Sequence, residues 1–267
     1  MTEAVIRQHL DETAVVGRYL RCFDEIDSTN SYVKRIALEG APNGTVVLAD
    51  AQTAGRGRMN RTFQSPKGRG IYLTVLLRPE LPPERLLPVT ALAGVAVCDA
   101  VEALCGVRPG LKWPNDPVLA GRKLCGILTE LGTDPAGGLY LALGIGINVL
   151  QTEEDFPPEL RTMAGSLAMA GHPVSREALT AALITALDRL YGALGQENLA
   201  DWLAAYRRDC VNLGKTVQLI RPDGSRQMAE AIGIDDWFGL TVRYPDGREE
   251  TIRSGEVSVR GLYGYVE

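Results

Sequence analysis

Hydrophobic and polar residues along the chain follow two different periods, and each period predicts a different kind of element. Short apolar runs rich in β-branched residues are typical of strands, whereas apolar residues recurring every three or four positions are typical of helices. The first strands are predicted at residues 18–24, 45–49 and 71–77. Between the first two of them, Ser28 or Thr29 should cap a helix over residues 31–38 that ends before Gly40.

The middle of the chain contains a segment that is apolar on almost every side. This segment, residues 88–104, predicts a buried helix rather than a partner-binding one. Two further strands are predicted at residues 127–131 and 139–143, joined by a Gly/Pro loop. Residues 175–194 and 199–208 each carry one apolar stripe, which predicts surface helices with that stripe turned inwards.

From Gly214 onwards the pattern changes to short alternating strands. Two Pro-Asp-Gly triplets, at residues 222–224 and 245–247, predict hairpin turns because proline presets φ and glycine accepts the left-handed conformation. Such a tail is typical of a small β-barrel. We therefore predict two domains, residues 1–210 and residues 211–267.

Composition narrows the class of protein without indicating a function. The chain has 267 residues, of which 45% are hydrophobic and 23% are charged, as in a soluble globular protein with one large core and one small one. The net charge of -5 argues against nucleic acid or a membrane surface as a general partner. The N-terminus lacks an apolar run of signal-peptide length, and we expect no segment to approach the roughly 20 apolar residues of a membrane span. The cytoplasm is the predicted location.

The five cysteines form no CxxC pair, and the chain has only two histidines. This pattern fits neither a zinc site nor a disulfide framework. We expect most of these thiols to be reduced core residues. The cysteines are Cys22, Cys98, Cys105, Cys125 and Cys210.

Positive charge gathers in one segment of this acidic chain. Residues 51–79 contain no acidic side chain but carry six basic ones, centred on the Gly-Arg-Gly-Arg run at 55–58. Glycines allow backbone N–H groups to approach a ligand, and arginines match carboxylate and phosphate oxygens with two parallel hydrogen bonds. An anion carrying both groups is the predicted ligand. A solvated basic loop without a ligand and a segment that binds single-stranded nucleic acid remain alternatives.

Two shorter motifs add candidate catalytic residues. In Lys-Trp-Pro-Asn-Asp at 112–116, proline ends a strand, and Asp116 could hold a metal–phosphate group or accept a proton. An Asx turn explains the same Asn-Asp pair equally well. Lys123 follows an Ala-Gly turn and precedes an apolar strand, where an inward-facing ammonium group would need an anionic partner. A surface lysine of a hairpin is the alternative.

The Gly-Ile-Gly-Ile-Asn run at 144–148 ends another apolar strand. Its glycines permit close approach of the backbone, and Asn148 can both donate and accept hydrogen bonds towards a sugar or an amide. The run lacks the third glycine of a dinucleotide fingerprint, and the chain has no GxxxxGK[ST] phosphate loop. A bound nucleotide is therefore not held in the Walker manner.

Taken in this order, the motifs resemble those of the biotin protein ligase family. The matching stretches are Ser28-Thr29-Asn30, Gln52, the runs at 55–58, 65–66, 112–116, 122–128 and 144–148, and Gly-Glu-Val-Ser at 255–258. The chain differs from the usual family pattern in carrying Phe63 where tryptophan is common. Another difference is Gly-Arg-Gly-Ile-Tyr at 68–72 in place of Gly-x-Asn-Leu-Tyr.

The resemblance implies a fold and a reaction. The fold would be α+β, with a catalytic domain like that of the class II aminoacyl-tRNA synthetases followed by an SH3-like barrel. The reaction would be ATP-dependent activation of biotin to biotinyl-5′-AMP, with Mg²⁺, and transfer to a lysine of a carboxylase carrier domain. Too little chain precedes Arg18 for a DNA-binding module, so we expect the ligase-only form, without nucleic-acid or membrane partners and with homodimerisation an open possibility.

The resemblance also implies residue roles. Arg58, Lys123 and Asp116 would be catalytic, with Asp116 acting on the acceptor amine or contacting Mg²⁺ in the absence of a dedicated metal site. Biotin would contact Ser28, Thr29, Asn30, Gln52, Arg56, Gly57, Arg58, Lys123 and Gly126. ATP would contact Arg58, Arg61, Phe63, Lys112, Asn115 and Asn148.

Two other functions remain compatible with the sequence. A lipoate or octanoate ligase shares the fold and the chemistry, but the polar set at Ser28, Thr29, Asn30 and Gln52 is poorly suited to an aliphatic acid. A non-catalytic biotin-binding regulator would not need Lys123 and Asp116.

Overall fold

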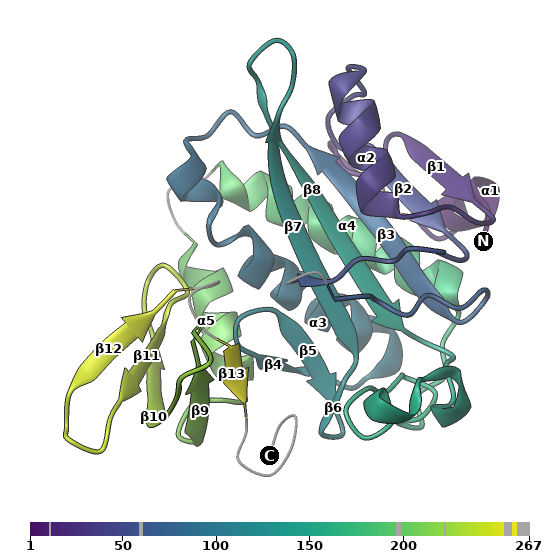
Figure 1. Ribbon diagram of the computed structural model, residues 1–267. Helices are drawn as coiled ribbons and strands as arrows, with labels where there is room; N and C mark the ends of the chain where they lie inside the picture. The colour runs from purple at the N-terminus through teal and green to yellow at the C-terminus, as the bar shows by residue number, and fades with distance from the viewer. Residues whose placement is uncertain (11, 59–60, 196–198, 222, 254–257, 261–267) are drawn as a thin grey trace.

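A five-stranded mixed sheet forms the centre of the fold in the computed structural model (Figure 1). The structure describes residues 1–267 except 11, 59–60, 196–198, 222, 254–257 and 261–267. The sheet order is β1–β2–β3–β8–β7; β1 is parallel to β2, and the other neighbours are antiparallel. The strands are β1 (Leu20–Phe23), β2 (Val46–Ala49), β3 (Gly70–Leu77), β7 (Cys125–Thr133) and β8 (Leu139–Asn148). The predicted α+β class is confirmed.

Both faces of this sheet are covered, which explains why its inner strands lack alternating polar residues. On β2, Val46 and Leu48 belong to one apolar cluster, while Val47 belongs to another on the opposite face. Because side chains alternate across a strand, a strand between two cores is apolar at every position. All four residues of β2 and all eight of β3 are buried.

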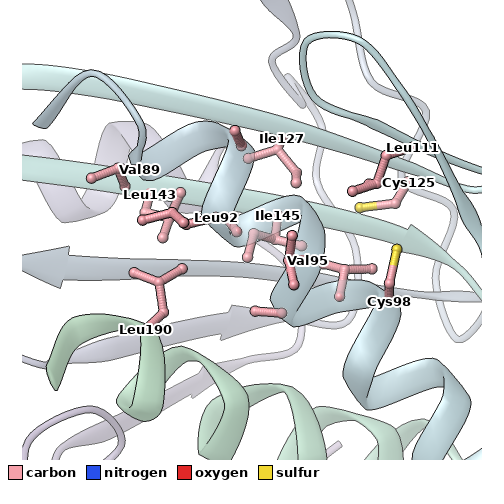
Figure 2. Packing of buried hydrophobic residues seen from close by; sticks show 14 of the residues in the cluster. Val89, Leu92, Val95, Cys98, Leu111, Cys125, Ile127, Leu143, Ile145 and Leu190 are labelled. Carbon is pink, nitrogen blue, oxygen red and sulfur yellow. The ribbon is translucent and has the colours of Figure 1, made fainter. Parts of the chain in front are cut away.

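The larger core lies between the sheet and two long helices, α3 (Val89–Cys105) and α4 (Arg176–Leu194) (Figure 2). Leu92 and Val95 of α3 pack towards Ile127 and Ile145 of the sheet. The other helices are α1 (Glu3–Arg7), α2 (Thr29–Leu38) and α5 (Ala200–Asp209). Helix α2 lies on the opposite face and contacts β2, β3 and β8. The sequence pattern correctly predicted α2 to α5 but not α1.

Helix α3 corrects one expectation from the sequence. By length and composition, the helical segment Pro83–Cys105 is apolar enough to cross a membrane. The expectation that no segment approaches this length was therefore wrong. Since 72% of the 18-residue apolar stretch in this segment is buried inside the fold, the segment is typical of a core helix. The predicted buried helix at residues 88–104 is confirmed.

The cysteines are free thiols, as expected. Cys98, Cys125 and Cys210 are buried, while Cys22 and Cys105 are half-buried and pack against the core. Burial raises the pKa of all five thiols, in the case of Cys210 to about 11. At neutral pH these groups are therefore protonated and weakly nucleophilic.

A small three-stranded meander carries the Lys-Trp-Pro-Asn-Asp motif. Its strands are β4 (Gly110–Lys112), β5 (Asp116–Leu119) and β6 (Arg122–Lys123). The strand before Trp113 ends as predicted, the Trp113–Pro114 peptide bond is cis, and Lys112 pairs with Asp116 across the turn. Ala120 and Gly121 both have positive φ, at 49° and 74°, and form the tight turn before Lys123.

A second sheet contains every strand that follows α5. Its order is β12–β11–β10–β9–β13, and all neighbours are antiparallel. The strands are β9 (Thr216–Ile220), β10 (Arg226–Ile234), β11 (Leu240–Arg243), β12 (Glu249–Ile252) and β13 (Ser258–Arg260). Gly224 and Gly247 have positive φ in the two predicted hairpin turns. This sheet agrees with a small C-terminal β domain; the exact domain boundary stays a prediction. Pro222 and residues 255–257 of the predicted motifs lie outside the described residues.

Candidate active site

The site lies on the same face of the sheet as α2, next to the N-terminal end of that helix. Alternate residues of β8 and β7 point to this face, and four of them, Gly144, Gly146, Gly126 and Gly132, have no side chain. Beside Gly126 lies a cavity of about 240 Å³. Its walls come from the loop at 56–64, the β4–β5 turn, the start of β7 and the segment 156–164.

All of the predicted catalytic and ATP-contacting residues, together with five of the predicted biotin-contacting ones, line this main cavity. They are Arg56, Gly57, Arg58, Arg61, Phe63, Lys112, Asn115, Asp116, Lys123, Gly126 and Asn148. A smaller inner pocket of about 20 Å³ adjoins it, and Arg56, Phe63, Gly126 and Leu128 line both. The inner pocket contains the rest of the predicted set, Ser28, Thr29, Asn30 and Gln52. The structure thus brings together motifs that are up to 120 positions apart in the chain, from Ser28 to Asn148.

Phe63 separates the two cavities. Its ring lies on Gly146 and Gly126, so closely that a Cβ built at Gly146 would be 2.5 Å from Phe63 Cε1 and one at Gly126 would be 3.1 Å from Cε2. The two glycines are directly opposite each other on β8 and β7. They are therefore required for the aromatic ring to lie against the sheet.

Gly146→Ala should displace the Phe63 ring without unfolding the chain. The added methyl group meets the ring of a side chain rather than the backbone, and overpacking of this kind costs about 1–3 kcal/mol, which corresponds to a KM for the substrates about 5- to 150-fold higher if the cost falls on binding. Steady-state kinetics checks this. Gly233→Ala is the matched control, because a Cβ there would lie 3.8 Å from its nearest neighbour. Equal KM values in both variants would contradict the arrangement.

The inner pocket is a continuous hydrogen-bonded network. The cap of α2 is Ser28, whose Oγ accepts from the Ser31 N–H at 3.5 Å. Gln52 Oε1 accepts from the Thr29 N–H at 2.9 Å and from Thr29 Oγ1 at 3.1 Å, and Gln52 Nε2 donates to Ser65 Oγ at 2.8 Å. These polar groups are buried or half-buried and fixed, as the recognition of a polar ring requires.

Two arginines of the glycine–arginine loop form hydrogen bonds with residues on the other side of the cavity. Arg58 Nη1 donates to Asn115 Oδ1 at 2.7 Å, and Asn115 Nδ2 donates to the Ile127 carbonyl at 2.7 Å. Arg56 Nη1 donates to Glu130 Oε2 at 3.0 Å. Within the loop, the Gly57 N–H donates to the Arg61 carbonyl at 2.7 Å. The loop therefore covers the cavity from one side.

The predicted pairing of Lys123 with an anion is also present. Lys123 Nζ lies 2.6 Å from Asp116 Oδ1, with the two side chains 31% and 16% exposed. The backbone of Lys123 is held by the segment that closes the cavity, since its N–H donates to the Met163 carbonyl and its carbonyl accepts from the Gly165 N–H. Lys112, only 4% exposed, lies in the same wall.

The β4–β5 turn is held from behind by α5 and the second sheet. Trp113 is 1% exposed; its Nε1 donates to the Phe238 carbonyl at 2.9 Å, and its backbone N–H donates to Asn212 Oδ1 at 2.7 Å. Tyr206 Oη donates to the Pro114 carbonyl at 3.0 Å. The C-terminal sheet thereby helps to position Asn115 and its neighbours.

Removing the Asn212 side chain should affect stability and activity together. Asn212→Ala leaves the buried Trp113 N–H without an acceptor, which should lower the free energy of unfolding by about 1–3 kcal/mol. Because the same turn carries Asn115 and Asp116, kcat/KM should fall as well. Urea unfolding and turnover measure the two effects. Asn43→Ala is the control, since Asn43 Oδ1 accepts from the Arg78 N–H at 2.8 Å far from the cavity; unchanged turnover in both variants would contradict the positioning role.

Comparison with known proteins identifies the family. A family model described as the Biotin/lipoate A/B protein ligase family matches residues 22–148. The bifunctional ligase/repressor BirA of Bacillus spizizenii is 35% identical over 248 residues, which are 92% of this chain and 76% of that protein. The chain belongs to the biotin protein ligase family. A second family member, the biotin–[acetyl-CoA-carboxylase] ligase of Mycobacterium tuberculosis, is 31% identical over 96% of this chain and 95% of its own length.

A solved biotin protein ligase has the same fold. The enzyme from Aquifex aeolicus, determined in complex with biotin and ATP, superposes with a TM-score of 0.80 at 28% identity and covers 91% of this chain and 99% of its own. The predicted class of fold is confirmed. The expectation of a form without a DNA-binding segment stays a prediction.

The main cavity of this biotin protein ligase family member also contains four residues that the sequence did not predict to lie at the site. Phe156, Leu160, Met163 and Ala164 line the main cavity from the segment after β8. They belong to no recognised motif, and although their spacing resembles one face of a helix, Pro157 and Pro158 interrupt it and the chain forms short 3-10 turns there (Glu153–Asp155 and Pro158–Leu160). These four residues reach the site because their segment lies beside Lys123, to which it is hydrogen-bonded.

The charge of the ligase cavity is strongly positive. Five cationic side chains line it, and among the described lining residues Asp116 carries the only carboxylate. The structure also shows, within the described part of the chain, no cluster of three metal-ligating side chains. A ligand with carboxylate and phosphate groups matches these charges. The five cations are Arg56, Arg58, Arg61, Lys112 and Lys123.

Proposed function

We propose that this chain activates biotin with ATP and transfers the biotinyl group to a lysine of a carboxylase carrier domain. The observation that carries the proposal is a polar inner pocket that opens into a cavity lined by five cations. The ureido ring of biotin needs fixed polar partners, which Ser28, Thr29 and Gln52 provide. Its carboxylate then extends past Phe63 into the region of positive charge.

The first step joins two anions. A carboxylate oxygen of biotin attacks the α-phosphorus of ATP, a P–O bond forms, and pyrophosphate leaves. Arg58, Arg61 and Lys123 offset the repulsion between the carboxylate and the phosphate and stabilise the charge that develops on the phosphorus oxygens. Lys112 and Asn148 complete the wall on which the nucleotide would lie.

The second step consumes the mixed anhydride. The amine of the acceptor lysine attacks the biotinyl carbonyl, an amide bond forms, and AMP leaves. Asp116 is the carboxylate placed to accept the proton or to orient the amine, since among the described lining residues no other carboxylate faces the cavity.

Mg²⁺ fits this site only as an ion that binds together with the phosphates of ATP. Mg²⁺ is often held by one or two carboxylates together with substrate phosphates, and the cavity offers Asp116 alone. When bound, the ion would neutralise charge on the phosphate oxygens. Homodimerisation stays an open possibility, and the cytoplasmic location stays a prediction.

Pyrophosphate release tests the proposed function. The purified chain mixed with biotin and ATP should release pyrophosphate, and addition of an apo carrier domain of a carboxylase should yield a biotinylated lysine in stoichiometric amounts. Lipoate and octanoate are tested in place of biotin, since the family model also covers lipoate ligases. Pyrophosphate release with either of these acids instead of biotin, or with none of the three, would overturn the proposal.

A further inference from the structure

Glu130 connects the inner pocket to the glycine–arginine loop. Its side chain, on β7 and 18% exposed, accepts three hydrogen bonds from two other parts of the chain. Lys34 Nζ donates to Oε1 at 2.8 Å, while Arg56 Nη1 and Asn30 Nδ2 donate to Oε2 at 3.0 and 3.1 Å. One carboxylate thus holds helix α2 and the loop against the same strand.

The contact with Asn30 fixes one wall of the inner pocket. Asn30 is 5% exposed, and its Nδ2 donates to Glu130 and to the Leu128 carbonyl, while its Oδ1 accepts from Thr74 Oγ1 at 2.7 Å. Both N–H groups of the Asn30 amide are therefore used within the protein. Asn30 also lies against Gly144, where a Cβ would collide with Oδ1. Its place in the pocket is thus set by Glu130 and the sheet.

The contact with Arg56 fixes the first arginine of the loop. Arg56 lines both cavities, and its side chain is 40% exposed. An exposed ion pair by itself contributes little to stability. Here the carboxylate is largely covered and also receives hydrogen bonds from Lys34 and Asn30, so it is a rigid acceptor for an otherwise solvated guanidinium.

We propose that Glu130 is a positioning residue of the reaction, which acts through Asn30 on the biotin pocket and through Arg56 on the loop that retains the adenylate. The proposal rests on the proposed function. Glu130 lines neither cavity, so the proposed role is exerted through the residues that do.

The ionisation of Glu130 agrees with this role. Burial raises the pKa of this carboxyl group, but the hydrogen bonds from Lys34 and Asn30 and the charge of Arg56 outweigh that effect and lower the pKa below its ordinary value. The group is therefore charged at neutral pH. Its contribution to stability is present above the ordinary pKa and is lost as the pH falls through the lowered value.

Two substitutions separate the two contacts of Glu130. Glu130→Gln is nearly isosteric and keeps an oxygen for Asn30, but it removes the charge that holds Arg56. We expect its pyrophosphate release and KM for biotin to stay near those of the unmodified chain, while labelling of lysines on a bystander protein rises about fivefold, the equivalent of about 1 kcal/mol of lost coupling. Glu130→Ala also frees Asn30, so its KM for biotin should rise about tenfold, as for one lost hydrogen bond to a charged group.

Asp134→Asn provides the matched control. Asp134 lies just after β7 and pairs with Arg78 at 2.6 Å; its side chain is 17% exposed, similar to the 18% of Glu130, but neither Asp134 nor Arg78 lines a cavity. Bystander labelling and KM should be unchanged in this variant. A rise in labelling equal to that of Glu130→Gln would show a general loss of rigidity and overturn the proposal.

A double-substitution cycle tests the route through Arg56. If Glu130 acts on the loop through Arg56, then Glu130→Gln should add nothing to the bystander labelling already caused by Arg56→Gln. Additive effects, or unmodified labelling and KM in both Glu130 variants, would overturn the positioning role. Neither result bears on the proposed function, which fails only if the unmodified chain releases no pyrophosphate with biotin and ATP.

Discussion

Replacing Lys123 with methionine should slow the release of pyrophosphate from biotin and ATP by about a hundredfold or more. Methionine keeps much of the length and apolar stem of lysine, so the loss comes mainly from the charge. In the structure this ammonium group lies in the cavity wall at 2.6 Å from Asp116. When a carboxylate and an α-phosphate approach each other there, Lys123 is a donor that the transition state needs more than the separate substrates do.

A single-turnover measurement of pyrophosphate isolates this step from transfer to the acceptor. Lys67→Met is the control, because Lys67 also pairs with an aspartate at 2.6 Å, Asp24, and belongs to the same basic segment, but it does not line either cavity. We expect the control variant to keep the rate of the unmodified chain. A Lys123→Met variant that is folded and releases pyrophosphate at the normal rate would remove Lys123 from the activation step.

The sheet could be predicted from the sequence because its physical cause is local. A strand that lies between two cores, such as β2, is apolar at every position, and the cap of α2 at Ser28 is recognisable from neighbouring residues alone. The site motifs could be found because they combine glycines with charged or amide groups at strand ends. Every predicted site residue lies on one of the two adjoining cavities.

The supporting residues of the site could not be predicted, because their roles depend on contacts between distant parts of the chain. In the sequence, Glu130 is only a polar residue within a predicted strand. Its partners Arg56 and Asn30 are 74 and 100 positions away, and only the fold brings them into contact with it. Trp113 belongs to a recognised motif, yet its partners Asn212 and Phe238 follow it by 99 and 125 positions. The apolar wall at Phe156–Ala164 follows a short helix-like spacing that Pro157 and Pro158 interrupt, and nothing in that pattern relates it to the site.

The position of Phe63 shows how sequence and structure complement each other. From the sequence, the aromatic residue and the paired glycines of β7 and β8 are separate observations. The structure places the Phe63 ring directly on Gly126 and Gly146, so that one stacking surface divides the polar pocket from the cationic cavity. The chain therefore has an aromatic ring between the two cavities.

Asp116→Asn should separate the two half-reactions, since the acceptor amine needs deprotonation only in the second. Asparagine keeps the shape of the side chain and an oxygen for Lys123, so adenylate formation should fall by less than about tenfold. Transfer from preformed biotinyl-5′-AMP to an apo carrier domain should fall by about a hundredfold or more, as for loss of a general base. Both rates are measured at a fixed concentration of folded enzyme.

The dependence of transfer on pH then decides what Asp116 does. An unperturbed lysine has a pKa of about 10.4, so between about pH 7 and pH 9 the fraction of free amine rises about tenfold per unit. If Asp116 is the base, transfer by Asp116→Asn should follow that rise and approach the rate of the unmodified chain at high pH. A variant that stays equally slow at every pH would show that the carboxylate orients the amine instead, and normal transfer at pH 7 would exclude Asp116 from the second step altogether.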